Sequence, residues 1–246
     1  MNATTEQLPF FLIRVHSHGK QEEGILTTPR EAAAPLIVFL HDRFGSGYHN
    51  LYMSQVLRNH GFATLTPTLP GFGFSKSDQD WGGPASIDTC ISLIQEAKKI
   101  LGYEPKIGLW GAGYGATVGS KLLLSYPHFS AAVIQSGLYD LVWGYKSLLI
   151  KNDLKEKLLI ATGGFHEELL ARSFTRLVDD SYMVPTLLLH GEDDERAPLA
   201  QARALFSILK KNGTPVDFFM FPKRNHYLGP KIRDERTLPF LKEHLM

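Results

Sequence analysis

The sequence predicts an α/β fold in which helices cover both faces of a mostly parallel sheet. Short apolar runs of strand length alternate with longer segments of helical period along almost the whole chain. Several of these runs are apolar throughout instead of alternating with polar residues, which is typical of strands buried on both faces. Such strands are found in parallel sheets that lie between layers of helices.

The first part of the chain supplies strands around one helix. The run Leu36–Leu40 is fully apolar and ends in a glycine-rich loop, 41–47. A helix over Asn50–Asn59 is expected to end near Gly61, because glycine favours helix ends. The strands expected here are Phe10–Val15, Gly24–Thr28, Leu36–Leu40 and Phe62–Thr66.

Ser86–Leu101 predicts an amphipathic helix that ends at Gly102, a favoured residue after a helix end. Its apolar face includes Cys90, the only cysteine of the sequence, so no internal disulfide can form. We interpret this thiol as a small core residue. The later elements are expected in this order: strand Ile107–Trp110, helix Gly115–Ser125, strand Ala131–Gln135, strand Thr186–His190, helix Pro198–Asn212, strand Val216–Phe221 and a helix near Ile232–His244.

The segment from Tyr139 to Met183 breaks the alternation of strands and helices. It carries helical patterns over Leu154–Ile160 and Glu167–Phe174 but no convincing strand. We expect an insertion, 139–183, that packs over the carboxyl ends of the strands as a small helical lid; ordinary connecting helices are the alternative. No repeat or linker marks a second domain, so residues 1–246 are expected to form a single α/β domain.

Composition argues against several kinds of partner. The formal net charge is +1, so the chain has no strong positive potential that would attract nucleic acid or an anionic membrane. The N-terminus lacks the order of a signal peptide, and the apolar runs are too short to span a bilayer. We therefore expect a cytoplasmic protein with no nucleic-acid or membrane partner; the sequence does not determine its oligomeric state.

The segment 107–117 reads as a strand, a tight turn of small residues and the start of a helix. In the pattern G-x-S-x-G such a turn holds a serine hydroxyl above the sheet, but the central residue here is Gly113. The same residues match the dinucleotide pattern G-x-G-x-x-G/A. That pattern normally opens the first unit of a sheet, and Gln135 stands where the next strand should end in an acid. We therefore expect no nucleotide and no other cofactor.

An acid and a histidine follow Gly113 in the order in which hydrolases place a nucleophile, an acid and a histidine. Asp194 comes just after the strand Thr186–His190, and His226 just after the strand Val216–Phe221. Both thus lie at carboxyl ends of strands, where open α/β sheets bind ligands. A carboxylate there can orient an imidazole, which can then accept a proton from a nucleophile or water.

The stretch 184–201 carries a resemblance to a known family. From about Leu36 onward the chain resembles α/β-hydrolases of the prolyl-oligopeptidase and dienelactone-hydrolase-like group. The resemblance implies a serine-hydrolase-type enzyme, an esterase or peptidase acting on a small ester, amide or short peptide. It assigns Gly113 to the nucleophile position, Asp194 to the acid, with Asp193 as the alternative, and His226 to the base.

The same resemblance suggests the groups around the reacting bond. The loop 41–45 corresponds to the family's His-Gly loop, with Asp42 in place of the usual glycine. The backbone N–H of Arg43, or of Phe44, would pair with that of Tyr114 to form an oxyanion hole. Alternatively the loop is only a turn, or the Arg43 side chain holds a substrate carboxylate. Candidate substrate-binding residues of the lid are Trp143, Tyr145 and Phe165.

The missing hydroxyl at Gly113 excludes acyl-enzyme chemistry through that position. Three explanations stay open: a serine exchanged on purpose, a natural non-catalytic ligand-binding relative, or non-covalent acid/base catalysis by Asp194 and His226. Turnover after Gly113→Ser would discriminate between them. His16 and His18 would share one strand face, but no third ligand is near in the sequence, so no metal is expected.

Overall fold

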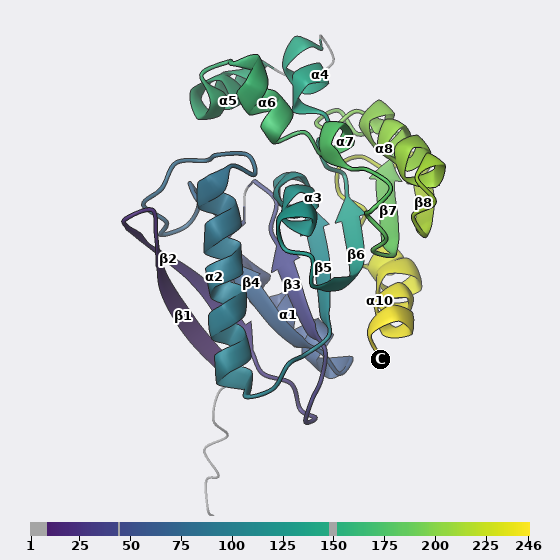
Figure 1. Ribbon diagram of the computed structural model, residues 1–246. Coiled ribbons are helices and arrows are strands. Elements are labelled where there is room, and N and C mark those ends of the chain that lie inside the picture. Colours follow the sequence, from purple (N-terminus) through teal and green to yellow (C-terminus); the bar gives the residue numbers. More distant parts are fainter. Residues whose placement is uncertain (1–8, 44, 148–151) are drawn as a thin grey trace, which may run out of the picture.

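An eight-stranded sheet forms the centre of the part of the chain that the computed structural model describes, residues 9–43, 45–147 and 152–246 (Figure 1). The strand order is β1-β2-β4-β3-β5-β6-β7-β8. β1 and β2 pair antiparallel, β2 pairs antiparallel with β4, and every later pair is parallel, which confirms the predicted fold class. The strands are β1 (Phe10–Ser17), β2 (Lys20–Thr27), β3 (Leu36–Leu40), β4 (Ala63–Pro67), β5 (Ile107–Ala112), β6 (Phe129–Gln135), β7 (Thr186–Gly191) and β8 (Val216–Phe221).

The central strands are apolar throughout because they contribute to two cores. Every residue of β3 is buried; Leu36, Val38 and Leu40 belong to one apolar cluster and Ile37 and Phe39 to the other. Successive side chains of a strand point to opposite faces, so each face of the sheet receives its own layer.

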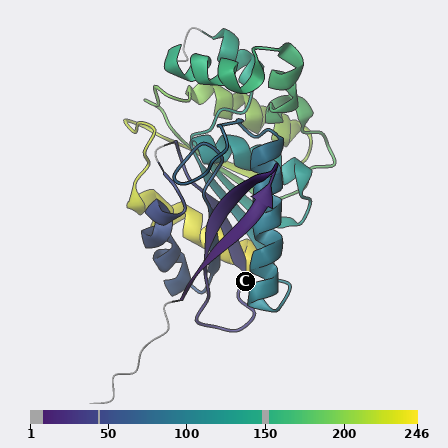
Figure 2. The same ribbon diagram turned by 90° about the vertical axis from the view of Figure 1, so that its left-hand side faces the viewer.

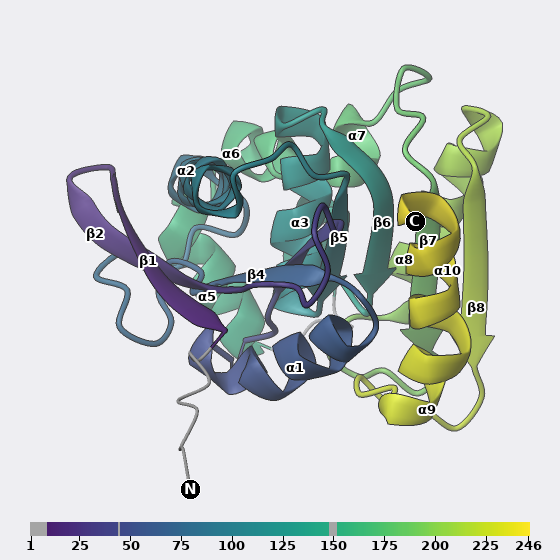
Figure 3. The ribbon, with the colours of Figure 1, turned by 90° about the horizontal axis from the view of Figure 1, so that it is seen from below.

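Helices cover both faces of this sheet (Figure 3). α2, α3 and α8 contribute to the cluster on one face, whereas α1 and α10 contribute to the cluster on the other. Cys90 lies on α2 and is completely buried, and burial raises the pKa of its thiol. The elements are η1 (Tyr48–Asn50), α1 (Leu51–Asn59), α2 (Pro84–Leu101), α3 (Tyr114–Ser125), α8 (Leu199–Lys211), α9 (Pro230–Ile232), a π-helical turn (Arg233–Thr237) and α10 (Leu238–Leu245).

The described part of the segment predicted as a lid, residues 139–147 and 152–183, forms four helices that lie beyond the carboxyl ends of the strands (Figures 1 and 2). They are α4 (Leu141–Lys146), α5 (Asn152–Thr162), α6 (His166–Ala171) and α7 (Phe174–Leu177). The buried Gln201 of α8 anchors the start of this segment, because its Oε1 accepts the N–H groups of Tyr139 and Asp140 at 2.9 and 2.8 Å. Its Nε2 donates to the Asp140 carbonyl at 3.0 Å.

One predicted helix is interrupted in the structure and another contains a π-helical turn. The helix expected near Ile232–His244 is continuous from Pro230 to Leu245, and its π-helical turn precedes Pro239 in the first turn of α10. Proline has no N–H to donate to the preceding turn, so the regular bonding pattern cannot continue through it. The helix expected over Glu167–Phe174 breaks at Ser173, whose hydroxyl donates to Leu169 and accepts the N–H of Leu141.

Candidate active site

The turn between β5 and α3 places Gly113 at the carboxyl edge of the sheet. Its backbone has φ 53° and ψ −117°, a region that L side chains rarely adopt. Its N–H donates to the carbonyl of Gln135 at 2.9 Å, which ties the turn to β6. A Cβ on Gly115 would lie 2.2 Å from the Leu40 carbonyl oxygen, so only glycine lets α3 begin this close to β3.

Asp194 and His226 meet next to this turn, from the loops after β7 and β8. The Nδ1 of His226 lies 2.8 and 3.0 Å from the two carboxylate oxygens of Asp194. Asp194 Oδ1 also accepts the backbone N–H groups of Arg196 and Ala197 at 2.9 and 3.0 Å. Both members of the pair are buried, whereas the alternative acid, Asp193, is exposed. The carboxylate therefore fixes the orientation of the imidazole, as in a catalytic dyad.

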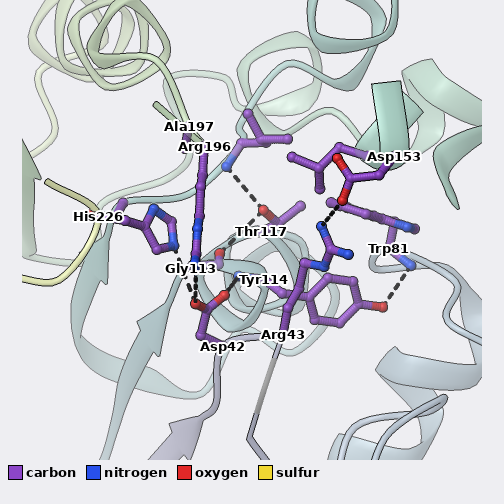
Figure 4. A pocket seen from close by; sticks show the side chains of 13 residues that line it. Asp42, Arg43, Trp81, Gly113, Tyr114, Thr117, Asp153, Arg196, Ala197 and His226 are labelled. Atoms are coloured by element: carbon purple, nitrogen blue, oxygen red, sulfur yellow. Dashed lines mark hydrogen bonds and ion pairs between the residues drawn. The ribbon is translucent and has the colours of Figure 1, made fainter. Parts of the chain in front are cut away.

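A third ionisable side chain completes this group: Asp42, directly after β3 (Figure 4). Its Oδ1 accepts the backbone N–H of Tyr114 at 2.9 Å, and its Oδ2 lies 3.3 Å from His226 Nε2. The imidazole is therefore held between two carboxylates, one at each ring nitrogen.

A neutral histidine holds the backbone of the Asp42 loop. His41 is buried, and burial lowers its pKa to about 4. Its Nε2 accepts the N–H of Leu69 at 3.0 Å, so its Nδ1–H donates to the carbonyl of Asp42 at 2.8 Å. The N–H of Gly45 donates to the same carbonyl at 2.8 Å. The two hydrogen bonds to the Asp42 carbonyl thus fix the backbone of this loop.

The carboxylate of Asp42 occupies the space into which a side chain at position 113 would project. A Cβ built on Gly113 would lie 2.0 Å from Asp42 Oδ1, 2.3 Å from Asp42 Cγ and 2.8 Å from His226 Nε2. Cβ contacts of this length do not occur in folded proteins. A side chain at position 113 and the present conformer of Asp42 therefore exclude each other.

The charges of this group are coupled. Burial lowers the pKa of His226, but its contacts with Asp194 and Asp42 outweigh burial and raise the pKa to about 9. Burial likewise raises the pKa of each carboxylate, yet the imidazolium and backbone N–H groups bring both below their usual value. At neutral pH the site therefore holds an imidazolium between two carboxylates.

The predicted oxyanion-hole donors both face the Asp42 carboxylate. The N–H of Tyr114 donates to Oδ1, and hydrogen bonding from the Arg43 backbone contributes to the lowered pKa of Asp42. The Arg43 guanidinium forms an ion pair with Asp153 of α5 at 3.7 Å. The alternative donor, Phe44, lies outside the described residues. The donors are thus present but already engaged by an internal carboxylate.

A cavity of about 230 Å³ opens at this group. Aromatic and aliphatic side chains and the two arginines Arg43 and Arg196 share its wall. Helix α5 contributes Asp153 and Leu154 to this wall, but the predicted residues Trp143, Tyr145 and Phe165 are not part of it. The lining residues are Asp42, Arg43, Trp81, Gly113, Tyr114, Thr117, Ser136, Leu138, Asp153, Leu154, Arg196, Ala197 and His226.

The predicted substrate-binding aromatic residues lie elsewhere in the segment 139–183. Trp143 and Tyr145 belong to the short helix α4, and Tyr145 packs against the apolar core cluster. Phe165 precedes α6 and is 67% exposed. The structure therefore does not bring these three residues to the cavity.

Sequence reasoning missed Asp42 as a member of the site. The available signal was a pair of departures from one pattern: glycine where a serine is expected, and aspartate where the His-Gly loop has glycine. The sequence did not indicate that these two positions lie close together, because Asp42 and Tyr114, which the structure joins by a hydrogen bond, are 72 positions apart.

Other candidate sites are weaker. Within the described residues, no group of three or more His, Cys, Asp or Glu side chains is placed to hold a metal ion. His18 contacts Asp88 at 2.8 Å on the surface. Nor does any helix in residues 9–43, 45–147 and 152–246 combine the length and the apolar character needed to cross a membrane.

The chain matches the sequence profile described as the prolyl oligopeptidase family over residues 53–246. It is 27% identical over 217 residues to the uncharacterised peptidase YuxL of Bacillus subtilis, covering 81% of this chain and 32% of that protein. It is 22% identical to the acylamino-acid-releasing enzyme of Rattus norvegicus, covering 82% of this chain and 30% of that enzyme. The chain thus spans about a third of the length of these curated relatives.

Solved structures show the same fold. The uncomplexed acylaminoacyl peptidase of Pyrococcus horikoshii superposes with a TM-score of 0.83 at 21% sequence identity, covering 96% of this chain and 41% of that chain. A putative dipeptidyl aminopeptidase IV of Bacteroides ovatus superposes with a TM-score of 0.80 at 16% identity, covering all of this chain and 37% of the other. The similarity extends over nearly the whole sheet and its helices.

Proposed function

Because the chain belongs to the prolyl oligopeptidase family, we propose that its cavity receives a small ester, amide or short peptide without turning it over by serine chemistry. The observation that carries this proposal is the position of Asp42. Its carboxylate fills the space in which a serine side chain at position 113 would lie, and it engages the N–H of Tyr114. A cytoplasmic location stays a prediction from the sequence.

Serine-type acyl transfer needs a hydroxyl nucleophile, a neutral imidazole to accept its proton and free donors for the carbonyl oxygen. Gly113 supplies no hydroxyl. The raised pKa of His226, about 9, keeps its imidazole protonated at neutral pH. The Tyr114 N–H is occupied by Asp42. All three requirements therefore fail together, which favours a ligand-binding relative of the family's enzymes.

A single exchange of serine for glycine does not account for this arrangement, since Asp42 is a second departure from the family pattern. Non-covalent acid/base catalysis is the remaining alternative. The high pKa of His226 favours a role as proton donor over a role as general base in that case.

The test is hydrolysis of p-nitrophenyl butyrate by the unmodified chain, by Gly113→Ser, by Asp42→Gly and by the double variant. We expect activity from the double variant alone. Gly113→Ser stays silent because its Cβ would lie 2.0 Å from Asp42 Oδ1. Adding His226→Gln to the double variant should abolish the activity, and a fluorophosphonate should label position 113 only where Asp42 has been removed.

Three outcomes would contradict the proposal. Equal activity of Gly113→Ser and of the double variant would mean that Asp42 does not block the site. A folded but inactive double variant would mean that the remaining groups are not aligned for acyl transfer. Hydrolysis by the unmodified chain that is lost in His226→Gln would support acid/base catalysis instead.

A further inference from the structure

The two oxygens of the Asp42 carboxylate have different surroundings. Oδ1 accepts the N–H of Tyr114 at 2.9 Å. Oδ2 lies 3.3 Å from His226 Nε2, yet within the described residues it accepts no hydrogen bond of good geometry. Oδ2 is thus held by two ion pairs, with His226 and with Arg196 at 3.8 Å, and it can form a bond to carbon once Arg196 moves aside.

We propose that Asp42 is a nucleophile toward a saturated carbon that carries an anionic leaving group, such as that of an alkyl halide, and that the site hydrolyses the resulting ester. The engaged Tyr114 N–H argues for this substrate class over acyl compounds. Attack on a carbonyl needs free donors for the new oxyanion. Displacement at a saturated carbon creates no oxyanion and needs only a nucleophile and a place for the leaving group.

In the first step Oδ2 of Asp42 attacks the carbon. The new O–C bond forms while the carbon–halogen bond breaks, and its electron pair leaves with the halide. One group that can receive an anion lines the cavity: the guanidinium of Arg43, which lies 3.7 Å from the Asp153 carboxylate (Figure 4). At about 230 Å³, the cavity has room for a substrate of a few carbon atoms.

Access to Oδ2 requires a movement of Arg196. Oδ2 is screened from solvent, and the guanidinium of Arg196 lies 3.8 Å from it. The Arg196 side chain is 40% exposed and contacts the hydroxyl of Tyr227 at 3.1 Å. It is therefore a surface side chain that an entering substrate can displace without disturbing the core.

In the second step the neutral ester no longer holds the proton on His226. Asp42 is one of the two carboxylates that raise its pKa, so the imidazolium releases a proton to solvent. Neutral Nε2 then takes a proton from a water molecule whose oxygen bonds to Cγ of Asp42. The oxyanion develops on Oδ1, which already faces the N–H of Tyr114. Cleavage of the Cγ–Oδ2 bond expels the alcohol, which takes the proton back from His226. The carboxylic acid left on Asp42 then gives the second proton of the water to Nε2, which restores the carboxylate and the imidazolium.

The balance closes: alkyl halide and water give alcohol, halide and one proton, and the Asp42 carboxylate is regenerated. The mechanism also predicts where the oxygen atoms go. The first alcohol molecule carries an oxygen of Asp42, and the oxygen of water stays in the carboxylate.

The experiment uses 1-bromobutane as the probe and the full chain as the enzyme. We expect bromide release by the unmodified chain and, in a single turnover in ¹⁸O water, heavy oxygen in the peptide that contains Asp42 but not in the butanol. His226→Gln should accumulate one butyl group per chain at Asp42, because ester hydrolysis loses its base. Asp42→Asn should lower bromide release to the background and take up no butyl group, whereas Asp180→Asn, an exposed matched control, should behave like the unmodified chain.

The proposal is overturned if the unmodified chain releases no bromide, or if the label enters butanol directly. It is also overturned if the butyl group lies on another residue or if Asp42→Asn releases bromide at the normal rate. The isotope measurement needs no variant, so misfolding cannot mimic its result. The inference rests on the proposed function only in placing Asp42 at the site. Ester hydrolysis by the Asp42→Gly, Gly113→Ser double variant is a separate measurement, so either proposal can fail while the other holds.

Discussion

Replacing Asp42 by asparagine should lower the pKa of His226. The imidazole has a carboxylate at each nitrogen, 2.8 Å away at Nδ1 and 3.3 Å away at Nε2, and its pKa is about 9. Burial alone would lower that pKa. Asparagine keeps the shape of the side chain and removes its charge, so the exchange isolates one of the two contributions.

The size of the effect follows from the Nε2–Oδ2 distance. Two unit charges 3.3 Å apart interact by about 5 kcal/mol at an effective dielectric constant of about 20. The net effect is smaller, because Arg196 lies 3.8 Å from the same oxygen and partly neutralises it. Opposite charges at such distances shift pKa values by about 1–3 units. We therefore expect the pKa of His226 to fall by about that amount.

The assay is an NMR titration of the imidazole in the unmodified chain, in Asp42→Asn and in the control Asp153→Asn. Asp153 lines the same cavity but pairs with Arg43, so its exchange should leave the titration almost unchanged. A pKa for His226 that differs by less than about half a unit between Asp42→Asn and the unmodified chain would refute the ion-pair reasoning.

The same shift has a defined effect on stability. The folded pKa of His226 lies above the ordinary value of 6.5, so its stabilising contribution is complete below about pH 6.5 and is lost as the pH rises through about 9. The whole contribution is of the order of 3 kcal/mol. Urea unfolding at increasing pH between these values should show the free energy of unfolding of the unmodified chain falling relative to that of His226→Gln.

Two further predictions concern groups that support the site. Burial lowers the pKa of His41 to about 4. The unfolded chain therefore takes up this proton first, and the free energy of unfolding should fall by up to roughly 3 kcal/mol as the pH drops from 6.5 to 4. Urea unfolding should show that the free energy of His41→Asn falls less steeply over this pH range. An equally steep fall in the variant would contradict a neutral, buried His41. Gln201→Ala leaves the buried N–H groups of Tyr139 and Asp140 without their acceptor. It should lower the unfolding free energy by about 2–4 kcal/mol, whereas the exposed control Gln95→Ala should change it by less than about 0.5 kcal/mol.

The sequence predicts the sheet closely because buried strands carry an unambiguous signal. Leu36–Leu40 and Val216–Phe221 have the bounds of β3 and β8 in the structure. Both are short runs flanked by turn-forming residues, so the pattern indicates their length as well as their type. Helix regularity was harder to predict, since the break at Ser173 and the π-helical turn before Pro239 depend on local hydrogen bonding.

Half of the site follows from topology. Asp194 and His226 come after β7 and β8, which pair in parallel, so their loops leave the sheet side by side. The carboxylate of Asp42 reaches the same point from β3, and no spacing in the sequence gives that distance. The lid residue Phe165 was chosen as an aromatic beside the site, but where a lid helix points depends on packing that composition does not encode.

The exclusion between positions 42 and 113 constrains how such a site can arise. The family pattern pairs glycine in the His-Gly loop with serine at the turn, whereas this chain pairs Asp42 with Gly113. Acquiring the aspartate first would force a serine Cβ to within 2.0 Å of its carboxylate. Losing the serine first leaves a chain with neither side chain, which folds without collision but has no nucleophile. With Asp42 in its present conformer, only the second order avoids the collision, and it passes through a chain that has no nucleophile.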